Sequence, residues 1–464
     1  MLSKKNIYFL GGGGIGMSAL MRYFLAQGKN VAGYDKTQTH LTEKLINEGA
    51  VLHFQDEVQF IPVAFQNKEE ALIIYTPAIP SDSPQLNYFK DEGYALYKRS
   101  EILGMITQMN YNIAVAGTHG KTTISSMVAH CLKHCKYPLT AFLGGVSKNL
   151  GSNYYHDKDS KVTVIEADEY DRSFLKLSPN IISVSAADAD HLDIYGTEEE
   201  MQNTFRKFLT DNLQKDGSAI IEKTLEGVLG NDFETYSLQD STADYFVTNL
   251  RVEGSVFTAD FNWIGSGKSK IIKDVIVGLP GIHNMENALV TFAIVLKLGI
   301  PAIEIKAALA AYAGVERRFD MHIKTEKCIY IDDYAHHPEE ITSLVLSVKK
   351  MYPDKKITGV FQPHLFSRTR DFLDGFAKAL DLLDTAIILD IYPARELPIP
   401  GINSELLLSK MKKNSKMLCS KKDMHHHISN GDCEVVLTIG AGDIGMEVEK
   451  VKQNLLNRLK IKES

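Results

Sequence analysis

Short apolar runs alternate with longer amphipathic stretches along most of the chain. Residues 6–10, 30–34, 112–116 and 162–165 are such runs, and each has the length and apolar content of a buried strand. The stretch that ends at about Ala26, "TTISSMVAHCLKHC" and "EEEMQNTFRKFL" have the periodicity of helices. A strand, a turn and a helix in repeated order predict an α/β protein whose sheets are mostly parallel.

Composition and charge exclude several classes of protein. The 51 basic and 58 acidic side chains give a net charge of −7, which argues against a general nucleic-acid-binding surface. No apolar run approaches the roughly 20 residues that span a bilayer, so we expect no membrane segment. The 5 cysteines are an odd and sparse set for a long chain, which predicts a reduced cytoplasm rather than a disulfide framework.

The turn after residues 6–10 carries glycines at the spacing of a dinucleotide-binding fingerprint. Gly11, Gly13 and Gly16 match G-x-G-x-x-G, and Asp35 ends the next strand about 20 positions further on. This pattern predicts a Rossmann-like domain, with a pyrophosphate at the helix N-terminus and a ribose hydroxyl near Asp35. NAD, FAD and a UDP-sugar all carry a pyrophosphate, so the pattern leaves the nucleotide open. The Pro-rich loop in "ALIIYTPAIPSDSP" is a second candidate lining of the pocket.

The stretch "IAVAGTHGKTT" ends like a phosphate-binding loop, although Val115 occupies the place of the usual first glycine. Gly117 and Gly120 flank a short turn, Lys121 can reach the outer phosphates of a nucleotide, and a hydroxyl of the Thr pair that follows can ligate Mg²⁺. The phosphates would face a helix N-terminus. An ordinary turn between a strand and a helix is the alternative reading.

Further polar side chains follow strand-like runs. Glu166 ends the run at residues 162–165, where phosphate-loop enzymes place a Mg²⁺ ligand, and His191 stands between two aspartates after the next run. His191 could hold a second metal ion or belong to a helix-capping cluster. Asn284 and Asn287 open a helix after a Gly/Pro turn, where they could cap the helix or contact a base or ribose.

The chain length and these motifs together predict three domains. At about 150 residues per domain, 464 residues correspond to roughly three. We expect a Rossmann-like domain over residues 1–109 and a central phosphate-loop ATPase-like domain over residues 110–315 with a mostly parallel sheet. Strand-like runs in "CIYIDDYAHHP", "KITGVFQPH", "AIILDIYP" and "EVVLTIGAGDIG" predict a second Rossmann-like domain over residues 316–464, whose ligand edge lies at the strand C-termini.

Eight motifs in one order carry a resemblance to a known family. The segments "GTHGKTT", "EADEYD", "DADHLD", "GIHNMENA", "RRF", "DDYAHHP", "FQPH" and "GAGDIG" resemble the Mur ligases, which are ATP-dependent amide ligases of cell-wall precursor synthesis. The phosphate loop of that family has the shortened G-T-x-G-K-[ST] form. Within the family, "GGIGMSAL" and the blocks around "FQPH" and "SRTRDF" are similar to the branch that joins L-alanine to UDP-N-acetylmuramate through an acyl phosphate.

The resemblance implies a role for each matching residue. Lys121, His191, Arg318 and His336 match catalytic positions, and Thr122, Glu166 and His191 match the ligands of two Mg²⁺ ions. His336 and Arg368 match positions near the incoming amino acid. The residues expected to bind ATP are Gly117, Thr118, His119, Gly120, Lys121, Thr122, Thr123, Asn284, Asn287, Arg318 and Asp333. The residues expected to bind the UDP-sugar are Gly11, Gly13, Gly14, Ile15, Gly16, Asp35 and Thr76.

The implied partners are small molecules, namely ATP, UDP-N-acetylmuramate and L-alanine. No nucleic acid or membrane is expected, and we expect a cytoplasmic monomer or weak homodimer. Leu365 departs from the family, which often has Arg at that position, and this weakens the assignment of alanine more than that of the reaction.

Three rival functions remain at the level of sequence. The nearest is the recycling ligase of the same family, which attaches a whole tripeptide to the same UDP-sugar. The second is an NAD-linked oxidoreductase built on the Gly11–Gly16 fingerprint, which leaves Lys121, Glu166 and His191 without a task. The third is a non-catalytic ATP-binding module.

Overall fold

The computed structural model describes residues 2–189, 192–254, 256–265, 267–394, 396–413, 415–430 and 434–461. Within these residues it forms three α/β domains, each built on its own sheet, as the sequence predicts. The chain divides into two compact units. The first comprises Met1–Thr248, Asp260–Val275 and Glu286–Tyr312, and the second comprises Asn249–Ala259, Ile276–Met285 and Ala313–Ser464.

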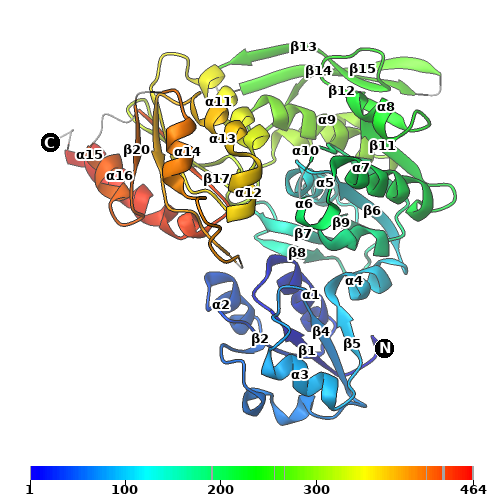
Figure 1. Cartoon of the computed structure of the whole chain (residues 1–464). Coiled ribbons are helices and arrows are strands. Elements are labelled where there is room, and N and C mark those ends of the chain that lie inside the picture. The colour runs from blue at the N-terminus through cyan, green and yellow to red at the C-terminus, as the bar shows by residue number, and fades with distance from the viewer. Residues whose placement is uncertain are drawn as a thin grey trace. The chain divides into compact units, whose positions relative to one another are not determined.

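The N-terminal domain has the strand order β3-β2-β1-β4-β5, and its neighbouring strands are parallel (Figure 1). This is the order of a Rossmann sheet. The strands are β1 (Asn6–Leu10), β2 (Asn30–Tyr34), β3 (Val51–His53), β4 (Ala71–Tyr75) and β5 (Leu96–Lys98). The helices are α1 (Ile15–Ala26), α2 (His40–Asn47), α3 (Pro84–Asp91) and α4 (Arg99–Thr107).

Alternate side chains of β1 enter two different hydrophobic clusters, as the twofold period of a strand requires. Ile7 and Phe9 pack with residues of α1 and α4, whereas Tyr8 and Leu10 pack with Leu86 and Phe89 of α3. The sheet is therefore buried on both faces, which explains why its strands read as continuous apolar runs rather than as alternating ones.

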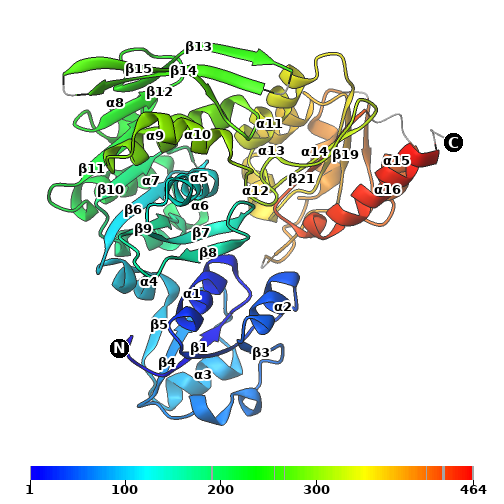
Figure 2. The same ribbon diagram turned by 180° about the vertical axis from the view of Figure 1, so that it is seen from behind.

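The central domain has the strand order β15-β14-β13-β12-β11-β10-β6-β9-β7-β8 (Figure 2). The pairs around β6, β9 and β10 are parallel, and β7 pairs with β8 in antiparallel orientation. The strands are β6 (Tyr111–Ala116), β7 (Leu139–Ser147), β8 (Ser152–His156), β9 (Val162–Glu166), β10 (Ile181–Val184), β11 (Ser218–Glu222), β12 (Glu234–Ser237), β13 (Tyr245–Glu253), β14 (Val256–Gly265) and β15 (Lys268–Ile276). The helices are α5 (Lys121–His134), α6 (Leu192–Tyr195), α7 (Glu198–Lys207), α8 (Glu226–Leu229), α9 (Ile282–Lys297) and α10 (Ala302–Ala310), with a 3₁₀ segment η3 (Tyr170–Lys176).

The C-terminal domain has the strand order β16-β17-β21-β18-β19-β20, and only the β16–β17 pair among the described strands is antiparallel. Its strands are β16 (Asp320–Lys324), β17 (Ile329–Asp333), β18 (Ile357–Phe361), β19 (Thr385–Ile388), β20 (Lys416–Leu418) and β21 (Val435–Ile439). Its helices are α11 (Pro338–Met351), α12 (Phe366–Asp371), α13 (Leu373–Leu380), α14 (Ser404–Lys410), α15 (Met424–Asn430) and α16 (Val448–Ile461). Pro338 is the first residue of α11, a position at which its fixed φ suits the start of a helix.

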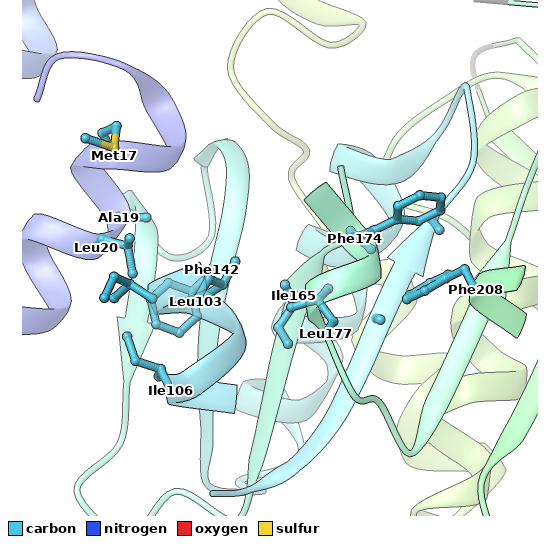
Figure 3. Packing of buried hydrophobic residues seen from close by; sticks show 14 of the residues in the cluster. Met17, Ala19, Leu20, Leu103, Ile106, Phe142, Ile165, Phe174, Leu177 and Phe208 are labelled. Carbon is cyan, nitrogen blue, oxygen red and sulfur yellow. The ribbon is translucent and has the colours of Figure 1, made fainter. Parts of the chain in front are cut away.

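One hydrophobic core joins the first two domains within the first unit. Met17, Ala19 and Leu20 of α1 belong to the same buried cluster as Phe142 of β7 and Ile165 of β9 (Figure 3). Its other labelled members are Leu103, Ile106, Phe174, Leu177 and Phe208. No helix among the described residues combines the length and the apolar character that crossing a membrane requires.

Candidate functional site

The phosphate loop lies between β6 and α5, at the carboxyl end of a central parallel strand. Gly117 has φ +128° and Gly120 has φ +83°, which are backbone conformations that favour glycine. A Cβ atom on Gly117 would overlap Ser185 Oγ, and the amide of Thr118 donates to the carbonyl of Ala186 at 3.0 Å. The loop is therefore fitted closely to the residues that follow β10, and its two glycines are required where they stand.

Lys121 is the first residue of α5, and its ammonium group is held by the loop and by a buried carboxylate. Nζ donates to the carbonyl of Gly117 at 2.6 Å and to Glu169 Oε1 at 2.8 Å. The side chain of Glu169 is 1% exposed and that of Lys121 is 14% exposed. Burial alone would lower the pKa of Lys121, but the neighbouring carboxylates, with Glu169 first, raise it above its ordinary value. Lys121 is thus a charged group at the helix N-terminus.

Thr122 and Glu166 place a hydroxyl and a carboxylate next to each other beside the lysine. Thr122 Oγ1 donates to Glu166 Oε1 at 3.0 Å, and the amide of Gly144 donates to Glu166 Oε2 at 2.8 Å. A Cβ atom on Gly144 would overlap the Glu166 carboxylate, so this close approach requires glycine. A hydroxyl and a carboxylate at the start of a phosphate-loop helix are the oxygen donors that Mg²⁺ prefers, and the residues present therefore fit a Mg²⁺ ion.

The remaining predicted residues of the central site have different outcomes. His191, together with Asp190, lies outside the described residues. Asn287 approaches the loop, because a Cβ atom on Gly120 would lie 3.0 Å from its Oδ1. Asn284 instead donates through Nδ2 to the carbonyl of Pro280 at 2.7 Å, which fixes the turn before α9. Asn287 can therefore face a nucleotide on the loop, whereas the hydrogen bond of Asn284 to Pro280 stabilises the turn.

The fingerprint turn of the N-terminal domain brings together most of its predicted residues. The amide of Gly13 donates to Asp35 Oδ2 at 2.7 Å, and the amide of Thr37 donates to Asp35 Oδ1 at 3.0 Å. Asp35 therefore shapes the turn itself. Gly11 has φ +88°, and a Cβ atom there would run into the methyl group of Thr76, so Thr76 lies against the turn.

Arg99, the first residue of α4, lies against the same turn, although no sequence motif points to it. A Cβ atom on Gly16 would lie 2.7 Å from Arg99 Nη1, so the guanidinium covers the first turn of α1. Its Nη2 also lies 3.3 Å from Asp168 Oδ2. A pyrophosphate at the N-terminus of α1 would therefore meet a cation as well as the helix dipole.

In the second unit, Arg318 stands between two residues with left-handed backbone. Arg317 has φ +62° and Phe319 has φ +47°, a conformation that costs non-glycine residues free energy and is concentrated at functional sites. Arg317 is anchored by bonds to Asp332 at 3.0 Å and to the carbonyl of Gly440 at 2.7 Å. Arg318 stacks over the ring of Tyr334, with its guanidinium carbon 4.9 Å from the ring centroid.

Asp333, His336 and Arg318 gather at the carboxyl end of β17. Asp333 accepts backbone hydrogen bonds from Phe319 at 2.6 Å and from Ala335 at 2.7 Å, and burial raises the pKa of its carboxyl group to about 6. Glu340 lies 3.6 Å from Arg318 and 3.3 Å from the ring of His336. These groups form one charged cluster at the strand end where ligands bind in open α/β sheets.

Arg368 lies in α12, and Leu365 is the residue just before that helix. Arg368 is buried, with 7% of its surface exposed, and lies on α12 three residues after Leu365. Leu365 precedes the helix with φ +70° and ψ 139°, a combination that is nearly confined to glycine. The ring of His364 lies 6.1 Å from that of His336, which places the "FQPH" loop beside the charged cluster.

Four residues of these sites escaped the sequence reasoning. Glu169 lies in the carboxylate-rich run after β9, and the sequence favoured Glu166 there because it comes first. Gly144 belongs to a glycine pair inside a strand, which is a recognised signal of close backbone approach. Glu340 stands at the third position of α11, where a capping box is expected. Arg99 had no local signal.

The fold and these sites define an enzyme of the α/β class with a nucleotide fingerprint, a phosphate loop and a third domain that carries a charged ligand edge. Three family models match the chain in order. "Mur ligase family, catalytic domain" matches residues 6–111, "Mur ligase middle domain" matches residues 115–295, and "Mur ligase, glutamate ligase domain" matches residues 317–442. The chain belongs to the Mur ligase family.

Two curated relatives indicate which branch of the Mur ligase family this chain resembles. The UDP-N-acetylmuramate–L-alanine ligase of Parabacteroides distasonis is 46% identical over 461 residues, which cover 98% of both chains. The ligase of the same name from Christiangramia forsetii is 46% identical over 454 residues and also covers 98% of both chains. This chain is similar to both over nearly its whole length.

Two solved structures are similar to this chain over nearly its whole length. The UDP-N-acetylmuramate-alanine ligase MurC of Thermotoga maritima has a TM-score of 0.82 at 28% identity, over 98% of this chain and 99% of that one. The murein peptide ligase of Psychrobacter arcticus has a TM-score of 0.69 at 23% identity, over 98% of both chains, and supports the fold alone.

Proposed function

We propose that the protein joins L-alanine to the lactyl carboxylate of UDP-N-acetylmuramate at the expense of ATP. The carboxylate would take the γ-phosphoryl group of ATP to form an acyl phosphate and release ADP. The amine of L-alanine would then attack the acyl carbon, so that an amide bond forms and phosphate leaves. The observation that carries the proposal is the Lys121–Thr122–Glu166 arrangement in a chain 46% identical to enzymes named for this reaction.

The chemical difficulty is to bring two anions together and to stabilise the transferring phosphoryl group. Lys121, charged and at the N-terminus of α5, would neutralise the outer phosphates. The loop residues Gly117 to Thr123 would cradle them with backbone amides, and Asn287 would face the nucleotide from α9. Arg318 and Asp333 would reach ATP from the C-terminal domain.

Thr122 and Glu166 would hold a Mg²⁺ ion, and His191 would hold a second one. An ion held there would supply Lewis-acid stabilisation of the charge on the transferring phosphoryl group. The metal preference and the presence of two ions are part of this proposal, as is the role of His191.

Roles for the whole domains follow from the same assignment. We assign the UDP-sugar to residues 1–109, with Gly11, Gly13, Asp35 and Thr76 around its pyrophosphate and ribose. The central domain, residues 110–315, would bind ATP. Residues 316–464 would add contacts to ATP and bind alanine through His336 and Arg368, where the buried cation suits the amino-acid carboxylate. The cytoplasmic location and the monomeric or weakly dimeric state stay predictions.

The test is phosphate release by the purified protein with Mg²⁺-ATP and UDP-N-acetylmuramate, with amino acids offered one at a time. Release with L-alanine that requires the UDP-sugar is the expected result. Lys121→Met should abolish it, whereas Lys297→Met, which removes a lysine paired with Glu234 away from the loop, should not. Absence of release with every amino acid would refute the proposal.

The same assay separates the rival functions. A tripeptide that replaces L-alanine as the required substrate would place the protein in the recycling branch. ATP-independent absorbance change of a nicotinamide with a hydroxy acid would support the oxidoreductase. A binding module should release no phosphate that depends on the UDP-sugar and amino acid together.

A further inference from the structure

The acidic segment Asp168–Arg172 begins just after the metal-ligand candidate Glu166. Each of its carboxylates pairs with a cation from a different element. Asp168 lies 3.3 Å from Arg99 of α4, Glu169 lies 2.8 Å from Lys121 of the phosphate loop, and Asp171 lies 2.9 Å from Lys98 at the end of β5. The segment therefore connects the phosphate loop with the N-terminal domain through side-chain charges.

Stability does not explain the left-handed turn and the two exposed ion pairs of this segment. Asp171 has φ +54° and Arg172 has φ +52°, so two successive residues adopt a backbone that costs side-chain-bearing residues free energy. The side chains of Asp168 and Asp171 are 39% and 36% exposed, and ion pairs that exposed contribute little to folding. A strained turn held by weak pairs is typical of a functional segment rather than of a structural one.

Both ends of the segment are fixed in the core. Ile165 precedes it, and Phe174 and Leu177 follow it, in the same buried cluster that contains Leu103 and Ile106 of α4 (Figure 3). The hydroxyl of Tyr195, itself buried, donates to the carbonyl of Glu169 at 2.6 Å. Because the ends do not move freely, the ion pairs decide only how the carboxylates between them are placed.

Arg99, which pairs with Asp168, also lies at the predicted UDP-sugar site of the N-terminal domain. Arg99 covers Gly16 on the first turn of α1, where the fingerprint predicts the pyrophosphate of the UDP-sugar. Asp168 and Glu169 are adjacent in the chain, so the group that orients Arg99 and the group that orients Lys121 share one backbone.

We propose that Asp168–Arg172 is a positioning element of the ligase reaction. Glu169 fixes Lys121 for the outer phosphates of ATP, and Asp168, through Arg99, fixes the segment to the helix turn that receives the UDP-sugar. Asp168 and Glu169 are positioning residues, since neither touches the reacting atoms. This inference rests on the proposed function, because it needs both substrates to bind as assigned above.

The first experiment replaces Glu169 with Gln, which keeps the shape and an acceptor oxygen but removes the charge. The expected result is a fall in kcat of roughly 10- to 100-fold, because a small displacement of a catalytic group costs that much. KM for L-alanine should stay within about threefold, since we assign that substrate to His336 and Arg368 of the C-terminal domain. Glu234→Gln breaks another Lys–Glu pair in the same domain, in which the glutamate side chain is 39% exposed, and should leave kcat within about twofold.

The second experiment is a double-variant cycle with Asp168→Asn, a part-exposed position at which the variant should fold. Asp168→Asn alone is expected to lower kcat by roughly tenfold. Because both changes act through the placement of Lys121, the double variant should lose no more than Glu169→Gln alone, within about threefold. Near-normal turnover of the folded Glu169→Gln variant, or effects that multiply in the double variant, would overturn the inference.

The two proposals fail in different ways. If the wild-type protein shows no phosphate release with UDP-N-acetylmuramate and L-alanine, the proposed function has failed. If the wild type turns over and the variants behave like Glu234→Gln, the positioning element alone is refuted.

Discussion

Replacement of Lys121 by Met separates the stability of the phosphate loop from its chemistry. The change removes the ammonium group that lies 2.8 Å from Glu169, whose side chain is 1% exposed. Removal of one partner of a buried ion pair typically costs about 3–5 kcal/mol, and we expect about 3 kcal/mol here because Lys121 is 14% exposed. The double variant Lys121→Met/Glu169→Gln removes both charges and should recover most of that stability.

Turnover should not follow the same course. The single and the double variant both lack the cation that stabilises the transferring phosphoryl group, so each should lose at least about 10²–10³ in kcat. A variant that regains stability without regaining activity would show that the lysine acts in the reaction and not only in the fold.

The sequence provides its own reporter for the stability measurement. Trp263 is the only tryptophan of the chain, it is buried in β14 of the first unit, and its ring centre lies 5.2 Å from that of Phe292. Urea unfolding followed by its fluorescence therefore reports on the unit that contains Lys121. The reasoning is refuted if Lys121→Met unfolds at the wild-type urea concentration, or if the double variant is no more stable than the single one.

Three further predictions concern the other sites. Asp35→Ala removes the acceptor of the Gly13 amide and should raise KM for the UDP-sugar about tenfold while KM for ATP stays within about twofold, measured by phosphate release. Gly144→Ala pushes a Cβ atom into the Glu166 carboxylate and should weaken Mg²⁺ binding by roughly 10- to 100-fold in a metal titration. Asp333 has a pKa of about 6 in the folded protein, above the unfolded value of about 3.9. The free energy of unfolding should therefore be highest below about pH 4 and should fall by about 3 kcal/mol as the pH rises through about 6. Asp333→Asn should remove that dependence in urea unfolding between about pH 4 and pH 8, followed by circular dichroism, and an unchanged slope would contradict the burial argument.

The sequence was sufficient for the parts of the site that follow from local order. Thr122 lies at the start of a helix after a glycine turn, and Glu166 ends a neighbouring strand, so parallel pairing alone brings the two together. The same logic predicted that Asp35 ends a strand. These residues could be found because a parallel sheet gathers its carboxyl ends at one edge.

Other contacts depend on geometry that has no local signature. Glu166 and Glu169 are three positions apart, and nothing in the local sequence tells which of the two carboxylates pairs with Lys121, as Glu169 does at 2.8 Å. Likewise, Arg99 approaches Gly16 only because α4 packs on α1 through a shared core. Side-chain pairs of this kind arise from tertiary packing, so the hydrophobic and polar pattern cannot specify them.

In the first unit, segments that lie far apart in the sequence pack together, and this affects how the chain folds during its synthesis. The ring of His130 in α5 is bonded at 2.8 Å to the carbonyl of Ala308, which stands 178 residues later. At translation rates of about 5–20 residues per second, Ala308 is synthesised roughly 10–40 s after His130 of α5. During that interval the phosphate-loop helix exposes the apolar surface that α10 later covers, so the nascent chain is most open to chaperones, and to aggregation, while the central sheet is being made.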